Sequence, residues 1–450
     1  MRTMRLRPLA ALSALVLSVL VPAGAARADR VPDDQPLPGY TIDNPPLPPV
    51  PVHGKPSRVL QGVHRHAAYD IEVPPQWNGR LALWAHGYAG QGRVLTVEPP
   101  PYGLRQRLLD QGYAWAASSY YDNGYDVRAG VLSTRDVAEL FARKVGRPRQ
   151  RIIAGVSMGG HIIGRSLEQF PGYYDGALPM CGVLGDNELF DYFLDYNLVA
   201  QDLSGVREYP VTEQYATVTV PKIEAALGLT ALRPGGPDTT NERGKQFRSI
   251  VINRTGGTRP GAVPSFALWK DFPFTLAEPS DPDATLAEDP GQVGTNLFTR
   301  YEPNGPVDVN RTVQRVRVEN PRARLSNRLS QVPRIDGRPD VPVLSLHGLG
   351  DLFVPFSMEQ AYARDVARNH RARLLVQRAV RTTQHCEFSN AEAGTAWDDL
   401  VRWIDGGARP AGDVTTRPSE VARPDYGCRF SDPAAYAAGT GTRRLFPACP

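Results

Sequence analysis

A serine flanked by glycines, Ser157, is the residue with the clearest chemical meaning in this sequence. It stands in the segment 155–159, which reads Gly-Val-Ser-Met-Gly, after the apolar run 151–154 and before a helix-like stretch at 160–167. A serine at such a strand-to-helix turn is held in a cramped backbone conformation that flanking glycines permit, and its hydroxyl is pushed clear of the sheet. The pattern therefore predicts a nucleophile at Ser157.

Two residues far along the chain, Asp351 and His385, are suited to activate this serine. A serine hydroxyl is a poor nucleophile until an imidazole accepts its proton, and a carboxylate fixes the tautomer of that imidazole. Asp351 follows the apolar run 341–346, and His385 follows the predicted strand 372–380. The chain order serine, aspartate, histidine is that of hydrolases whose serine occupies a strand-to-helix turn. We predict that Asp351 orients His385 and that His385 activates Ser157.

The negative oxygen that forms when a serine attacks a carbonyl needs hydrogen-bond donors already in place. One donor is predicted to be the backbone N–H of Met158, which follows the nucleophile. The second is predicted in the loop after His86-Gly87, at the N–H of Tyr88. These two groups form the predicted oxyanion hole, and His86 itself is expected to have a structural role.

Other acids and histidines compete for places in this predicted triad. Asp186 and Glu188 follow the strand after the serine turn and are the alternative acids. The competing histidines are worse placed, because each sits in a helix or before a glycine turn. They are His161, His347 and His370.

Alternating strands and helices are predicted to bring these side chains together. Such alternation favours a mainly parallel sheet with helices on both faces, which is the α/β class. The strands are predicted at 69–73, 80–85, 113–117, 151–154, 176–181, 341–346 and 372–380. The helices are predicted at 104–109, at 133–145 with Ser133 as its cap, at 357–369 and at 391–404.

Residues 186–340 separate the strand at 176–181 from the next clear strand, and this span is too long for a simple connection. It contains helical stretches at 187–203 and 212–227, so we predict a large, mainly helical cap inserted into the core. Its aromatic residues would either line a pocket or pack a core of the cap. They are Phe190, Tyr192, Phe193, Tyr196, Trp269, Phe272 and Phe274.

The beginning of the chain has the pattern of a secretory signal peptide. Three arginines precede the apolar run 9–21, and Ala26-Arg27-Ala28 is a small-x-small cleavage site, so we predict a signal peptide at 1–28, cleaved after Ala28. An uncleaved membrane anchor is the alternative. Residues 29–57 hold nine prolines and are predicted to form an extended leader. No later segment is apolar enough to span a membrane.

Four cysteines in an exported chain are expected to form two disulfides, which three pairings would satisfy. Cys428 and Cys449 lie close together in the tail 409–450, and a bond between them would close a short loop. Cys181 and Cys386 are then the remaining pair. This bond would tie two strand ends together beside the predicted nucleophile.

Charge and ligand spacing argue against nucleic-acid and metal binding. The chain has 51 basic and 47 acidic residues, and loss of residues 1–28 removes four arginines and no acid. The balance leaves no basic surface for nucleic acid. The cysteines lack the spacing of a zinc knuckle, and His64 and His66 lack a third ligand nearby. No cofactor or metal is therefore expected.

The serine turn, Asp351, His385 and the His86-Gly87 step together resemble the α/β-hydrolase superfamily, over roughly residues 67–181 and 341–404. The resemblance implies a secreted serine hydrolase with an eight-stranded sheet, split into core parts 58–185 and 341–408, and hydrolysis of esters or amides without a cofactor. The His385-Cys386 step is also similar to tannases and feruloyl esterases. Those families place a second cysteine directly before the nucleophile, whereas this chain has Val156, and Cys181 would replace it.

The function predicted from these residues is hydrolysis of a carboxylic ester through an acyl-enzyme on Ser157. The substrate would be a small-molecule or a polymeric ester. A serine peptidase that trims free N-termini, or a depolymerase of polyesters or phenolic esters, would use the same residues. A binding protein without catalytic activity on the same scaffold is the alternative outside enzymes.

Overall fold

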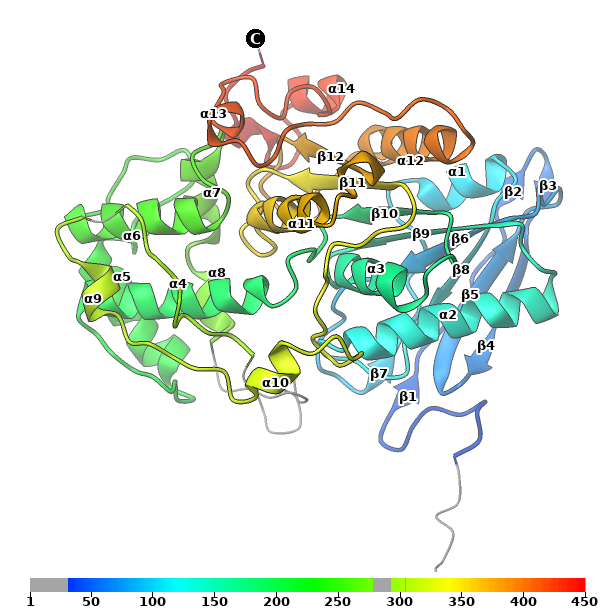
Figure 1. Ribbon diagram of the computed structural model, residues 1–450, viewed down its shortest axis with the longest axis horizontal. Coiled ribbons are helices and arrows are strands. Elements are labelled where there is room, and N and C mark those ends of the chain that lie inside the picture. Colours follow the sequence, from blue (N-terminus) through cyan, green and yellow to red (C-terminus); the bar gives the residue numbers. More distant parts are fainter. Residues whose placement is uncertain (1–30, 278–292, 304, 450) are drawn as a thin grey trace, which may run out of the picture. The chain divides into compact units, whose positions relative to one another are not determined.

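A central sheet of eight strands forms the core of the protein (Figure 1). The computed structural model describes residues 31–277, 293–303 and 305–449. The strand order is β12-β11-β10-β9-β6-β8-β5-β4, and all neighbours are parallel except those of β5, which is antiparallel to β4 and β8. The strands are β4 (Arg58–His64), β5 (Ala67–Val73), β6 (Arg80–Ala85), β8 (Ala114–Ser118), β9 (Gln150–Val156), β10 (Gly176–Met180), β11 (Val343–Gly348) and β12 (Leu375–Val380).

Helices cover both faces of this sheet, as predicted (Figure 1). The inner strands β8 and β10 are mostly apolar and are buried along their whole length, which is typical of strands packed on both faces. On β8, Ala114 and Ala116 belong to the core on one face, whereas Trp115 and Ala117 belong to the core on the other. The first core includes α2 (Val127–Lys144), α3 (Met158–Gln169) and α11 (Ser357–Arg368), and the second includes α1 (Leu104–Asp110) and α12 (Asn390–Ile404).

The helix predicted at 133–145 begins earlier than expected, and Ser133 does not cap it. Asp126 is the cap, because its side chain accepts a hydrogen bond from the backbone N–H of Ala129 at 2.8 Å, and Ser133 is buried inside the helix. Gly130 lies in the first turns of this helix, where a glycine is unfavourable. A Cβ atom there would lie 2.2 Å from Ile162, so the glycine serves the packing of α2 on α3.

The described residues before β4 contain only two-residue strands. These are β1 (Thr41–Ile42), which pairs with β7 (Val94–Leu95), and β2 (Pro51–Val52), which pairs with β3 (Lys55–Pro56). Side chains of the sheet bind this segment, since Asp70 accepts from Asn44 at 2.8 Å and Gln61 from the N–H of Leu47 at 2.9 Å. The predicted signal peptide at 1–28 lies outside the described residues. Within them, no helix is long and apolar enough to cross a membrane.

Every regular element in the described residues between β10 and β11 is a helix (Figure 1). The predicted helix at 212–227 is a π-helical turn, Tyr215–Thr219, followed by α5, in which Pro221 takes a first-turn position that needs no intrahelical N–H bond. The helices here are α4 (Glu188–Ser204), α5 (Val220–Leu227), α6 (Glu242–Arg254), α7 (Ala262–Trp269), α8 (Phe272–Thr275), α9 (Val309–Thr312) and α10 (Pro321–Arg324).

The C-terminal segment after α12 carries short helices, namely α13 (Pro418–Val421), α14 (Pro433–Ala437) and a 3₁₀ turn at Arg443–Leu445. The structure contains both expected disulfides, Cys181–Cys386 and Cys428–Cys449. The first joins the end of β10 to the loop after β12. The second closes the tail.

Candidate active site

Ser157 occupies a sharp turn between β9 and α3, with φ 57° and ψ −123°. This conformation is costly for a residue with a side chain, so the surroundings must hold it. They do so through the backbone: the N–H of Ser157 donates to the carbonyl of Met180 at 3.1 Å, and its own carbonyl accepts from Gly160 at 2.8 Å and Val183 at 3.1 Å. The side chain therefore stands on a turn fixed by the neighbouring strand β10.

The glycines of this turn are required by the close approach of neighbouring backbone. A Cβ atom on Gly155 would lie 2.2 Å from the carbonyl oxygen of Ala85, and one on Gly159 would lie 2.1 Å from the same oxygen. On Gly160 it would lie 2.3 Å from the Cα of Gly182. The glycine pattern thus reports how tightly the turn packs on the ends of β6 and β10.

Gly159→Ala is expected to lower the free energy of unfolding by about 3 kcal/mol, because the added methyl group must push β6 away and overpacking of this kind costs about 1–3 kcal/mol or more. The higher helix propensity of alanine returns at most about 1 kcal/mol. Urea unfolding followed by circular dichroism measures the change. Gly92→Ala is the matched control, because a Cβ atom there meets nothing within 4 Å. Equal midpoints for the two variants would contradict this explanation.

Ser157, His385 and Asp351 form one line of hydrogen bonds. The hydroxyl of Ser157 lies 2.8 Å from Nε2 of His385, and Nδ1 of the same ring lies 2.6 Å from Oδ2 of Asp351. Asp351 is fully buried, which favours a bond from Nδ1–H to its carboxylate and leaves Nε2 as the acceptor for the serine proton. The structure brings together all three residues predicted from the sequence.

The turn that carries Asp351 fixes its carboxylate. Oδ1 accepts the backbone N–H groups of Phe353 at 2.9 Å and Val354 at 3.1 Å, so only Oδ2 faces the imidazole. From the segment between β10 and β11, the hydroxyl of Tyr192 donates to the carbonyl of Leu352 at 3.0 Å. The carboxylate of Asp351 therefore has one orientation, in which Oδ1 is held by the backbone and Oδ2 is left for the imidazole.

The two predicted oxyanion donors stand on segments that touch Ser157. Met158 is the first residue of α3, so its N–H has no acceptor within the helix and lies at the positive end of the helix dipole. Gly87, next to Tyr88, is so close that a Cβ atom on it would lie 3.0 Å from the Cβ of Ser157. His86 is buried with its Nδ1 2.7 Å from the carbonyl of Gly87, and burial lowers its pKa. A neutral His86 thus shapes this loop.

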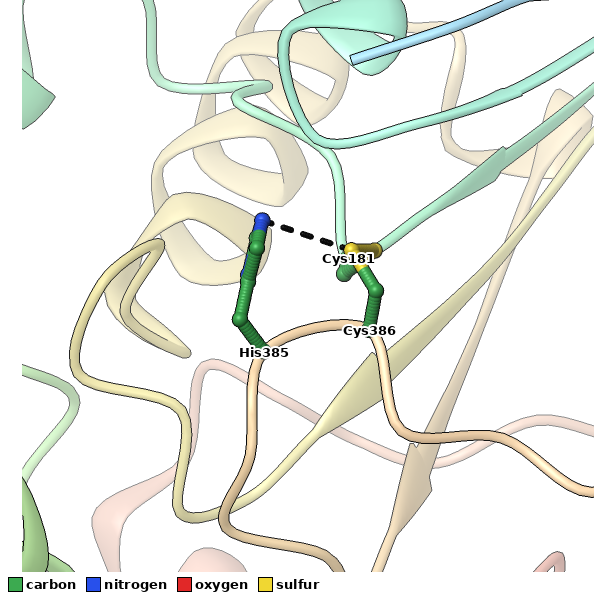
Figure 2. Close-up of side chains that lie close together, drawn as sticks. All are labelled: Cys181, His385 and Cys386. Atoms are coloured by element: carbon green, nitrogen blue, oxygen red, sulfur yellow. Dashed lines mark hydrogen bonds between the residues drawn. A yellow bond between two sulfur atoms is a disulfide. The ribbon is translucent and has the colours of Figure 1, made fainter. Parts of the chain in front are cut away.

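The Cys181–Cys386 disulfide lies beside the imidazole (Figure 2). The sulfur of Cys386 is 3.3 Å from Nε2 of His385, the atom that faces the serine. Within the described residues, Cys181, His385 and Cys386 are the one group of side chains whose ligand atoms lie close enough together to hold a metal ion. The two sulfurs are bonded to each other, however, so neither is a thiolate that could bind a metal. The disulfide links the loop of His385 to the end of β10, next to the turn that carries Ser157.

The alternative acids are engaged elsewhere. Asp186 accepts hydrogen bonds from the N–H groups of Asn187 and Ile335, and burial raises its pKa to about 7. Glu188 faces Arg364 at 4.0 Å. Neither carboxylate has a hydrogen bond to His385, whereas that of Asp351 does, so the structure does not bring the alternative acids to the imidazole.

Two of the competing histidines have other partners, and the third, His370, is exposed. His161 lies between the hydroxyl of Tyr125 at 2.9 Å and the carbonyl of Pro333 at 2.7 Å, and burial lowers its pKa to about 4. His347 is buried against Glu359 at 3.2 Å. Their contacts are those of packed structural residues.

Aromatic side chains border His385 on one side. The ring of Phe353 meets the imidazole edge-on at 4.9 Å between centroids, and Phe272 packs on Phe353 at 4.7 Å. Phe193 and Trp269 also contact the ring of Phe353, whereas Tyr196 packs against Phe247 and Phe274. The sequence reasoning missed Phe353, whose only signal was its place two residues after Asp351.

Comparison with known proteins gives one relative and several structural likenesses. No family model matches the chain. The chain is 22% identical over 444 residues to an o-phthalyl amidase of Xanthobacter agilis, across 85% of this chain and 92% of that protein. A solved esterase from Aspergillus oryzae matches with a TM-score of 0.45 and 12% identity over 79% of this chain and 81% of that chain. Feruloyl esterase B from Aspergillus oryzae matches with a TM-score of 0.44 and 15% identity over 77% and 79%.

The fold can be assigned from the chain itself. Its sheet has eight strands with β5 antiparallel to its neighbours, and the serine turn joins β9 in the middle of the sheet to α3. An acid and a histidine follow two later strands of the same sheet. On this strand order and this turn, the protein has the α/β-hydrolase fold.

Proposed function

We propose that this chain is a secreted serine hydrolase that cleaves carboxylic esters through an acyl-enzyme on Ser157. The observation that carries the proposal is the continuous line from the serine hydroxyl through His385 to the buried Asp351, with steps of 2.8 and 2.6 Å. Those distances lie within the range over which a general base takes a proton. Secretion is supported by the two disulfides, which persist in oxidising compartments.

In the proposed reaction, Oγ of Ser157 attacks the ester carbonyl carbon while its proton passes to Nε2 of His385. The negative oxygen of the tetrahedral intermediate accepts hydrogen bonds from the backbone N–H groups of Met158 and Tyr88. His385 then gives the proton to the leaving alcohol oxygen, and the bond from the acyl carbon to that oxygen breaks. A water molecule, deprotonated by His385, attacks the acyl-serine, releases the acid and restores the hydroxyl. Asp351 stabilises the imidazolium in both halves.

We further propose that residues 186–340 act as a cap inserted between the core parts 58–185 and 341–408 and help to choose the acyl group. The aromatic rings around Phe353 favour an acyl group with an aromatic ring, because ring pairs contribute about 0.5–1.5 kcal/mol beyond the area that they bury. The substrate would be a small or polymeric ester of such an acid, and no cofactor is needed.

Amide hydrolysis is the second candidate function. It is supported by the relative of 22% identity, an o-phthalyl amidase, whose alignment covers most of both chains. The same acyl-enzyme would form, and His385 would protonate a leaving amine in place of an alcohol.

Labelling with a fluorophosphonate tests the nucleophile, and matched substrates test the bond. We expect one adduct, on Ser157, and faster turnover of p-nitrophenyl benzoate than of benzoyl p-nitroanilide, because a phenolate leaves more easily than an anilide. Peptide mapping by mass spectrometry locates the adduct. The absence of an adduct on folded protein would support a binding protein without catalysis. Turnover of the anilide alone would show that the enzyme hydrolyses amides, and the proposal of ester hydrolysis would be wrong.

A further inference from the structure

The loop that carries His385 makes many of its hydrogen bonds to the C-terminal tail. It runs from the end of β12 to the start of α12, over residues 381–389. Residues 424–449 of the tail contact this loop both before and after His385 in the sequence. The contacts come from side chains that the proposed reaction does not use.

Thr442 of the tail contacts the loop both before and after His385. Its Oγ1 accepts the backbone N–H of Thr383 at 2.7 Å and that of Gln384 at 3.3 Å. Its own hydroxyl and backbone N–H donate to the carboxylate of Glu387, the latter at 2.9 Å. One threonine therefore connects the residues on both sides of the histidine.

The approach of the tail at this point is specific. Gly441 has φ 59°, which is strained for a residue with a side chain, and a Cβ atom on it would lie 1.7 Å from Oε1 of Glu387, so any other residue would displace this carboxylate. Arg443, whose side chain is 3% exposed, binds Glu392 at 2.6 Å. Glu392 in turn closes the capping box of α12 with Ser389. The tail thus joins the loop and the helix that follows it.

Arg381 anchors the other end of the loop in the tail. Its guanidinium is fully buried and donates to the carbonyls of Tyr426 at 2.9 Å and Pro447 at 2.7 Å, and to that of Pro424. Its backbone N–H donates to Oγ of Ser431 at 2.8 Å. A buried cation bonded to carbonyls from three points of the tail fixes the tail and the loop as one unit, because leaving such donors unpaired is costly.

We propose that the tail is a positioning element for His385 and that Thr442 is its principal positioning residue. The inference rests on the proposed function, in which His385 is the base. A base must stay within hydrogen-bond reach of the serine, and a displacement of about 1 Å can cost about 100-fold in rate. The Cys428–Cys449 disulfide encloses Thr442 and thereby keeps this part of the tail on the loop.

The test compares Thr442→Val, which keeps the shape but removes the hydroxyl, with Thr442→Ser, which keeps the hydroxyl. For Thr442→Val we expect kcat for p-nitrophenyl benzoate to fall about 30-fold with KM within twofold, and Thr442→Ser to recover most of the loss. Thr440→Val is the control, because that hydroxyl bonds to Ala435 within the tail and does not touch the loop. Thermal unfolding shows that each variant is folded.

A second readout does not depend on turnover. The proton between Nδ1 of His385 and Asp351 is expected as a low-field signal in the proton NMR spectrum, and it should exchange faster in Thr442→Val than in Thr442→Ser. If the parent protein neither labels nor turns over but this exchange still differs, the proposed function fails and the positioning role stands. Equal exchange and equal kcat in folded Thr442→Val and parent would overturn the positioning role. An equal loss in Thr440→Val would also overturn it.

Discussion

Ser157→Ala is expected to lower kcat for an activated ester by about 10⁶-fold, because the variant has no group to form the acyl-enzyme. His385→Ala should cost about as much, and the double variant little more. The serine and the histidine act as one unit, so the effect of both is lost when either is removed. The change is measured by steady-state kinetics with p-nitrophenyl benzoate. Each variant is purified separately, so that no parent protein contaminates it.

A matched serine separates this effect from loss of folding. Ser133 is buried in α2, and its hydroxyl has no hydrogen-bond partner among the described residues, so Ser133→Ala should leave kcat within twofold. The residual activity of Ser157→Ala should also resist fluorophosphonate. A kcat within 100-fold of the parent for pure Ser157→Ala would show that another nucleophile does the work and would end the acyl-enzyme proposal.

The meeting of Ser157, Asp351 and His385 could be predicted because all three follow buried strands of one parallel sheet. Such strands are rich in apolar residues, and their carboxyl ends share one edge of the sheet. The glycines at 155 and 159 were a further local signal. Their physical cause, contact with the carbonyl of Ala85, needs the neighbouring strand and was not visible in the sequence.

What could not be predicted depends on contacts between distant segments. The start of α2 at Val127 was not predicted, because Gly130 in its first turns has a low helix propensity. A glycine is needed there because Ile162 of another helix fills the space that a side chain would occupy. The edge strand β4 is half-exposed and has no strong apolar pattern, so it was missed. Thr442 lies 59 positions from Thr383, to which it bonds, and nothing in the local sequence marks it. Propensity and periodicity describe single elements and give no information on such pairs.

The disulfide pairing was predictable only in part. The short separation of Cys428 and Cys449 favoured their bond, and Cys181 with Cys386 remained. The sequence predicted that the Cys181–Cys386 bond would lie beside the nucleophile. It did not predict that the sulfur of Cys386 would lie 3.3 Å from Nε2 of His385, because that distance depends on the geometry of β10 and β12.

Asp351→Asn is expected to lower kcat by about 10⁴-fold while the fold stays intact. The reason lies in the two backbone N–H groups of Phe353 and Val354, which donate to Oδ1 at 2.9 and 3.1 Å. They require an oxygen at that position, so the amide NH₂ of the variant must face Nδ1 of His385. Nδ1 then becomes an acceptor, and the ring proton moves to Nε2.

With its proton on Nε2, His385 can no longer accept the proton of the Ser157 hydroxyl, and the base is lost although every atom is in place. Asp186→Asn is the matched control, because that carboxylate also accepts backbone N–H groups but does not contact the imidazole, and its kcat should stay within threefold. Nitrogen-15 NMR of the imidazole reads the tautomer directly. The expected result is a protonated Nδ1 in the parent and a protonated Nε2 in Asp351→Asn. At 2.6 Å from Nδ1, replacing the acceptor oxygen by a donor NH₂ must change the tautomer of the ring if Asp351 orients it. A variant with the parent's tautomer and a kcat within tenfold of the parent would therefore show that Asp351 does not orient the base.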